Sequence, residues 1–168
     1  MGYFKEIEGD LIELSLQEKF DVVAQGNNCQ NVQKSGLAPQ MVEAFGTDKF
    51  PMELEGKGDY NKLGQIDYEN RFVLDGKVYD RPYNLYGAKI LTVVNCYTQY
   101  NYGRNHADGD KAPFDYTAFR LCMRKINHVF KGKHIGLPKI GAGLAGGLWS
   151  HIGEYSPKGI MKGDPLYT

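Results

Sequence analysis

The chain has 168 residues, with 20 lysines and arginines balanced by 20 aspartates and glutamates, so its formal net charge is zero. This length suits one domain, and the charge balance gives no global positive field for nucleic acid or an acidic membrane. No apolar run approaches a membrane span, and the start MGYFKEIEGD lacks the plan of a signal peptide. We therefore expect a cytoplasmic protein.

Cysteine and histidine spacing indicates neither a metal site nor a disulfide framework. Cys29, Cys96 and Cys122 are odd in number, and the chain has no CxxC and no His/Cys metal spacing. Each thiol lies in or beside an apolar segment. We predict three reduced structural cysteines, no bound metal and no cofactor.

The amino-terminal segments predict short strands. Tyr3–Ile7 alternates as a strand, Gly9 and Asp10 turn the chain, and Leu11–Leu14 continues that strand or begins a second edge. Phe20–Ala24 is a short apolar run bounded by polar residues, which predicts a buried strand.

One short helix follows. Ala38–Phe45 has Pro39 in its first turn and Gly46 after its last residue, an asymmetry typical of helix ends. The composition of Thr47–Gly64 is mixed and allows either a helix or a loop.

A hairpin and a central strand occupy the middle of the chain. Ile66–Leu74 and Lys77–Tyr79 flank Asp75-Gly76, a dipeptide that tolerates the positive φ values of a two-residue turn. Lys89–Tyr97 is almost continuously apolar and rich in β-branched residues, which predicts a buried central strand.

Three further segments complete the pattern. We predict a polar loop over Thr98–Pro113, an amphipathic helix over Asp115–Phe130, and an apolar run from His134 to Ile140. The alternation of strand and helix periods, without an internal repeat, predicts an α/β fold.

Two loops have the composition of phosphate-binding turns. Glycines punctuate Gly141–Gly147, and Lys34–Gly36 precedes the predicted helix. Backbone without Cβ approaches an anion closely, and a helix N-terminus offers further N–H donors. Because ligands of open α/β sheets bind outside the carboxyl ends of strands, we expect residues 25–36, 98–110 and 141–147 to share one cleft. Two such loops suit a diphosphate.

Three motifs occur in a fixed order along the chain. They are Gly9-Asp10-Leu11, then Asn28-Cys29 followed by Lys34–Ala38, then Leu137–Leu144. In this order they resemble the GDI turn, the NC…GxGIA loop and the LPxIGxGL signature of macrodomains, a family that binds ADP-ribose and its derivatives. The nearest branch contains ADP-ribose-1″-phosphate phosphatases, terminal ADP-ribose glycohydrolases and phage-encoded proteins of that kind, so a viral chain would act in the host cytoplasm.

This resemblance implies a three-layer α/β/α fold with a central mixed sheet, over a core of residues 1–150. Residues 151–168 contain two prolines and three glycines and give clearly neither the helix nor the final strand of the family. We expect an atypical tail of the same domain, with that strand absent or irregular, or a partner chain in its place.

The resemblance also implies roles for single residues. Asp10 would accept a hydrogen bond from the adenine amine, with Leu11 beside it, and Tyr97 would stack on a base or ribose. The loops would hold the distal ribose and phosphates through Lys34, Ser35, Gly36, Leu37, Gly141, Ala142, Gly143, Leu144 and Ala145. A plain turn or helix-cap role for Asp10 and core or rim packing for Tyr97 are the alternatives.

Two residues are the catalytic candidates. Asn28 would reach the distal ribose or the group on its anomeric carbon, although an amide that bridges the loop is the alternative. His106 lies in a fragment similar to the histidine-bearing loop of the phosphatases and would protonate a leaving oxygen if its pKa is near neutral. An exposed loop histidine is the simpler interpretation of His106.

The implied function is binding of ADP-ribose and hydrolysis of a derivative, most simply ADP-ribose-1″-phosphate to ADP-ribose and phosphate. Ala145 stands where the glycohydrolases carry an acid, and their ribose-opening lysine has no obvious counterpart. A non-catalytic reader of ADP-ribose or NAD-derived nucleotides is therefore the alternative, besides hydrolysis of ADP-ribosylated protein. The oligomeric state stays open, and a nucleic-acid or mononucleotide binder fits the zero net charge poorly.

Overall fold

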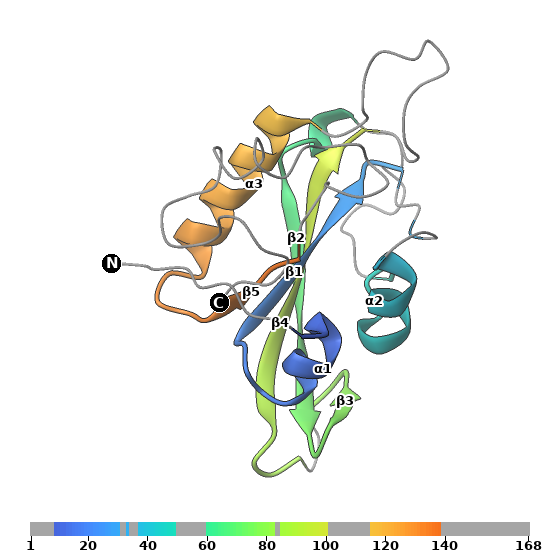
Figure 1. The fold of residues 1–168 in the computed structure, drawn as a ribbon, viewed down its shortest axis with the longest axis vertical. Helices are drawn as coiled ribbons and strands as arrows, with labels where there is room; N and C mark the ends of the chain where they lie inside the picture. Colours follow the sequence, from blue (N-terminus) through green and yellow to red (C-terminus); the bar gives the residue numbers. More distant parts are fainter. Residues whose placement is uncertain are drawn as a thin grey trace.

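The computed structural model describes residues 9–30, 33, 37–49, 60–82, 85–100 and 115–138. They form a five-stranded sheet in the spatial order β3-β2-β4-β1-β5, with helices on both faces (Figure 1). The helices are α1 (Leu11–Leu16), α2 (Ala38–Phe45), the 3-10 helix η2 (Tyr60–Lys62) and α3 (Tyr116–Val129). The strands are β1 (Val22–Asn28), β2 (Ile66–Leu74), β3 (Lys77–Tyr79), β4 (Lys89–Gln99) and β5 (Ile135–Gly136).

The sheet is mixed, as predicted. β1 runs parallel to both of its neighbours, β4 and β5, whereas β2 runs antiparallel to β4 and β3. The carboxyl ends of β1, β4 and β5 therefore meet at one edge of the sheet. We refer to it as the carboxyl edge.

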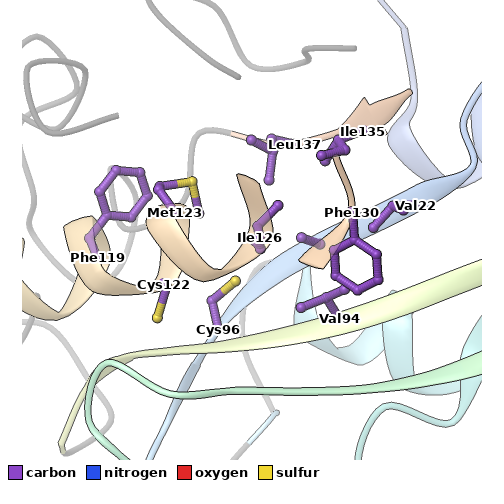
Figure 2. Packing of buried hydrophobic residues seen from close by; sticks show 11 residues of the cluster. Val22, Val94, Cys96, Phe119, Cys122, Met123, Ile126, Phe130, Ile135 and Leu137 are labelled. Carbon is purple, nitrogen blue, oxygen red and sulfur yellow. The ribbon is translucent and has the colours of Figure 1, made fainter. Parts of the chain in front are cut away.

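Each face of the sheet has its own apolar core. Under α3, Phe119 and Ile126 pack with Val22 and Val94, and Figure 2 shows Phe130 beside these two valines. On the opposite face, α1 and α2 pack against Val23 and its neighbours. Because consecutive residues at the start of β1 enter different cores, Val22–Ala24 is apolar without alternation. The three-layer α/β/α fold is confirmed.

Three predicted elements are confirmed with their boundaries. α2 ends at Gly46, which adopts a φ of 66°, and the β2–β3 turn places Asp75 at 51° and Gly76 at 77°. α3 is capped by the Asp115 carboxylate, which accepts a hydrogen bond from the Ala118 N–H at 2.9 Å.

The prediction of a strand over Leu11–Leu14 is wrong. These residues open α1, because the Asp10 carboxylate accepts a hydrogen bond from the Glu13 N–H at 2.9 Å and caps the helix. Leu11 is buried against the sheet and anchors the turn. A run of four residues is too short to distinguish the two periods.

Two strands are longer than predicted. β1 begins at Val22 and continues to Asn28, and β4 continues to Gln99. The extension of β1 is polar but buried, since Gln25 and Asn27 have hydrogen-bonding partners within the sheet region. The predicted strand Tyr3–Ile7 and the tail 151–168 lie outside the described residues.

Within the described ranges, no helix combines the length and apolarity needed to cross a bilayer. The same residues contain no group of three or more His, Cys, Asp or Glu side chains placed to hold a metal ion.

Asp21 joins the amino ends of three strands. Its carboxylate accepts a hydrogen bond from the His134 N–H at 2.9 Å and lies 3.3 Å from Lys89 Nζ, and its carbonyl accepts from the Thr92 N–H. Burial raises the pKa of Asp21, but the His134 N–H and Lys89 together outweigh burial, so the pKa is lowered overall.

We expect ionisation of the Asp21 carboxylate to make the free energy of unfolding depend on pH in the acid range. The folded pKa lies below the unfolded value of about 3.9, so the stabilisation is complete above that pH and is lost as the pH falls through the folded pKa. Urea denaturation of the wild type and of Asp21→Asn between about pH 2 and 6 measures this. Equal acid sensitivity in the two chains would contradict it.

Candidate functional site

The carboxyl edge is irregular where β1 ends. The β1–β4 register shifts between Asn27 and Asn28, so that Asn28 is paired with Gln99. The Cys29 N–H then lies within hydrogen-bonding distance of two carbonyls, that of Gln99 at the end of β4, at 3.0 Å, and that of Tyr100 just after it, at 3.1 Å. This irregularity fixes the direction in which the chain leaves the sheet after Asn28.

Asn28 lies at this edge and is buried, with 6% of its surface exposed. Its side-chain oxygen accepts a hydrogen bond from the Gln30 N–H at 3.1 Å, and its own N–H donates to the Asn27 side chain at 2.8 Å. The side chain therefore bridges the start of the loop, as the alternative interpretation expects. Contact between Asn28 and a substrate stays a prediction.

A network of buried polar side chains surrounds Gln33. Gln25 Nε2 donates to Gln33 Oε1 at 3.0 Å and to Asn95 Oδ1 at 2.9 Å. Gln33 and Asn95 both donate to the Thr47 carbonyl, at 3.0 and 2.8 Å, and the Thr47 hydroxyl donates to Gln33 Oε1 at 2.7 Å. The network joins β1, β4, the loop at Gln33 and the turn that follows α2.

The sequence interpretation missed this network. A weak signal exists, because Gln25 and Asn95 interrupt apolar runs in adjacent strands. Amides at such positions need buried partners. Which partners they find depends on the pairing of the strands, and the sequence alone does not reveal that pairing.

Tyr97 lies in the core with 1% of its surface exposed. Its hydroxyl donates to Asp67 Oδ2 at 2.6 Å, and Lys62 Nζ lies 5.5 Å from the centre of its ring. Burial and the nearby Asp67 carboxylate raise the pKa of the Tyr97 hydroxyl well above its usual range. This geometry is that of core packing, and contact between Tyr97 and a ligand stays a prediction.

Asp10 lines an open groove between α1 and α2, with a volume of about 410 Å³. The other lining residues are Ile12, Gln40, Glu43 and Ala44. One carboxylate oxygen of Asp10 caps α1, and no hydrogen bond to a described residue occupies Oδ2. Leu11 beside it is buried, and Leu37 is the N-cap residue that precedes α2.

The remaining predicted site residues lie outside the described residues. They are Lys34, Ser35, Gly36, His106, Gly141, Ala142, Gly143, Leu144 and Ala145. The structure thus describes Asp10, Leu11, Asn28, Leu37 and Tyr97 among the predicted site residues.

The three cysteines are free and buried, as predicted. Contact with the Cys122 thiol, together with burial, raises the pKa of Cys96 well above its usual range. A thiol held in its neutral form is a poor nucleophile, so Cys96 has a packing role.

Comparisons with known proteins give one sequence relative and several structural neighbours. The "Uncharacterized 17.5 kDa protein in tk-vs intergenic region" of Enterobacteria phage T4 is 31% identical over 156 residues, which cover 88% of this chain and 84% of the relative. No protein-family model matches the chain.

Solved structures share the fold at lower identity. The macrodomain of Thermus aquaticus DarG is 18% identical with a TM-score of 0.55, and the match covers 89% of this chain and 84% of that one. Thermosipho africanus DarTG in complex with ADP-ribose is 15% identical with a TM-score of 0.55. That match covers 88% of this chain and 36% of the DarTG chain.

Proposed function

Because the chain belongs to the family of the phage T4 17.5 kDa protein and has the macrodomain fold, we propose that it binds ADP-ribose at the carboxyl edge of β1, β4 and β5. The observation that carries this proposal is the fold shared with DarTG, a protein whose structure was solved with ADP-ribose. Of the ordered motifs that resemble macrodomain signatures, the second begins at this edge, where β1 ends at Asn28. ADP-ribosylated protein is a candidate partner, and the phage relative supports action in a host cytoplasm.

The three described α-helices differ at their N-termini in a way that supports an anion site. Aspartate side chains cap α1 and α3, whereas no side-chain hydrogen bond caps α2 at Leu37. The partial positive charge at a helix N-terminus favours an anion when no carboxylate occupies it. The chain before α2 also carries Lys34-Ser35-Gly36, so we assign one phosphate of ADP-ribose to this end of the helix.

Asp10 supports the placement of adenine. No described residue donates a hydrogen bond to its Oδ2 atom, and Asp10 lines the groove of about 410 Å³ between α1 and α2. The exocyclic amine of adenine would donate a hydrogen bond to this carboxylate. Hypoxanthine carries a carbonyl oxygen at the same ring position, and the carboxylate would repel that oxygen. We therefore assign the adenine end to Asp10 and the distal ribose to Asn28.

Hydrolysis of ADP-ribose-1″-phosphate is the reaction that we propose. Water attacks phosphorus, the bond to the anomeric oxygen breaks, and the products are ADP-ribose and inorganic phosphate. The chain supplies positioned donors for the negative charge on the phosphoryl oxygens, and the Asn28 amide is the donor that we assign to that end. His106 would protonate the leaving oxygen.

A reader that binds ADP-ribose without turnover is the second candidate. Ala145 favours it, because this position carries an acid in the glycohydrolases that the chain resembles. Alanine supplies neither a general base nor a ligand for the ribose hydroxyls. The same substitution argues against release of ADP-ribose from protein by their mechanism.

We expect the wild type to release phosphate from ADP-ribose-1″-phosphate, and Asn28→Asp to do so about 100-fold more slowly. Aspartate keeps the oxygen that accepts from Gln30 N–H but replaces the amide donor with a negative charge. Three measurements distinguish the phosphatase, the reader and the ADP-ribosyl-protein hydrolase. They are phosphate release, release of ADP-ribose from mono-ADP-ribosylated protein, and calorimetric binding of ADP-ribose.

The matched variant Asn28→Ala separates structure from chemistry. It removes both the bridge to Gln30 and the donor, so a greater loss of thermal stability than in Asn28→Asp measures the bridge. Binding of ADP-ribose without product from either substrate selects the reader. No heat with ADP-ribose refutes the proposal in both forms.

A further inference from the structure

Gln33 is a buried amide in the segment that joins β1 to α2. It has 8% of its surface exposed and lies in sequence between the turn at Cys29 and the start of α2 at Ala38. Its Oε1 accepts hydrogen bonds from Gln25 and Thr47, and its Nε2 donates to the Thr47 carbonyl. One buried side chain thus makes these three hydrogen bonds to described residues.

These bonds connect the segment to rigid parts of the fold. Gln25 and Asn95 are paired residues of β1 and β4 and are themselves hydrogen-bonded through their side chains. Thr47 follows Gly46, the residue that ends α2. Gln33 is therefore held both to the two central strands and to the turn beyond the helix that it precedes.

The pattern of donors and acceptors selects glutamine. The oxygen accepts two hydrogen bonds while the nitrogen donates one, and only a carboxamide of this length combines these roles without charge. An apolar side chain would leave the Thr47 hydroxyl and one Gln25 N–H without this acceptor. A buried polar group without a hydrogen-bond partner costs free energy, so the hydrogen-bonded arrangement is strongly favoured.

We propose that Gln33 is a positioning residue that holds the chain at position 33 against β1 and the turn after α2 for ligand binding. The proposal rests on the proposed function, because that function places the ribose and one phosphate of ADP-ribose along this segment. Gln33 acts through the backbone that it holds, without contact to the ligand. The consequence is an affinity that depends on a side chain buried behind the site.

The test compares two destabilising substitutions on opposite faces of the sheet. Gln33→Met keeps the length of the side chain and removes its hydrogen bonds, whereas Ile126→Ala opens the apolar core under α3. Calorimetry gives the ADP-ribose dissociation constant, and amide hydrogen exchange gives the protection of residues 29–37, both at a temperature where each variant is folded.

We expect Gln33→Met to weaken ADP-ribose binding about tenfold or more and to increase exchange at residues 29–37. Ile126→Ala lowers the melting temperature but leaves the dissociation constant within about twofold and exchange in this segment unchanged. Thr47→Val removes only the hydroxyl bond to Gln33 and gives a smaller effect in the same direction. In the double variant of Gln33 and Thr47 the two losses are less than additive.

The possible results separate this proposal from the function on which it rests. Wild-type affinity and protection in Gln33→Met, or an equal loss of affinity in Ile126→Ala, overturn the positioning role and leave ADP-ribose binding intact. A wild type that does not bind ADP-ribose overturns the proposed function, and the ligand role of Gln33 with it. If Gln33→Met does not fold, the ADP-ribose dissociation constant of Thr47→Val is compared with that of Ile126→Ala. A loss of affinity in Thr47→Val alone supports the positioning role, and wild-type affinity in Thr47→Val overturns it.

Discussion

Gly136→Ala is expected to lower the free energy of unfolding by about 1–3 kcal/mol. A Cβ atom at position 136 would lie 2.5 Å from the Phe20 ring, which is fully buried. Three ring atoms lie within 2.8 Å of that point, so the ring or the backbone of β5 has to move. Urea denaturation monitored by circular dichroism measures the loss.

The partner substitution tests the cause. Phe20→Ala alone should cost about 3–5 kcal/mol, because it leaves a cavity in the core that α1 and α2 share. In Phe20→Ala with Gly136→Ala, the new methyl group has room, so the double variant should lose less than the sum. An additive double variant would show that the ring contact is not the cause.

A second glycine is the control. Gly132 has a φ of 82°, and apart from its chain neighbours no described residue lies within 4 Å of the point that a Cβ atom would occupy there, so its requirement is conformational. Asparagine tolerates this region of φ, and Gly132→Asn should change stability by no more than about 0.5 kcal/mol.

Gly143→Val is expected to weaken ADP-ribose binding at least 100-fold, about 2.8 kcal/mol at roughly 1.4 kcal/mol per tenfold. The resemblance to the LPxIGxGL signature assigns this glycine to the diphosphate loop. A branched side chain there would occupy the space through which the backbone N–H groups approach the anion. Calorimetric titration with ADP-ribose measures the affinity.

The fold of this variant has to be checked separately from its affinity. Gly87→Asn is the matched control, because Gly87 lies in the loop before β4, at the opposite end of that strand from the carboxyl edge. Both variants should keep the wild-type melting temperature within a few degrees. Retained affinity in a folded Gly143→Val would remove the diphosphate loop from the site.

Local chemistry made three elements predictable from the sequence. Asp75-Gly76 permits few turns other than the observed one, and Pro39 with Gly46 marks both ends of α2. The apolar face of α3 repeats along a helix of 14 residues, which is long enough for the helical period to be unambiguous. In each case the signal depends on neighbours in sequence.

The errors arose where other contacts decide. Leu11–Leu14 is helical because a single hydrogen bond at Asp10 sets its start and burial against the sheet anchors it. The apolar run Phe20–Ala24 stops before Gln25, yet β1 continues through Gln25 because its amide finds Asn95 across 70 positions of sequence. A contact between residues so far apart in sequence leaves no signal in the residues around either one.

For the candidate site, too, the sequence predicted some features and missed others. Motif order indicated the macrodomain fold, and the comparisons agree with it. The burial of Tyr97 and the bridging role of Asn28 follow from Asp67 and Gln30, and no motif names those partners. A residue's place in a motif does not show which of its atoms are already hydrogen-bonded within the protein.

The order of the sheet also determines when its parts can assemble during synthesis. β1 lies between β4 and β5, so the ribosome releases it long before either neighbour exists. The β2–β3 hairpin and then β4 can form from adjacent segments, whereas β1 must wait with both edges open. The first-made part of a nascent chain is thus the part that most needs protection from other unfinished chains.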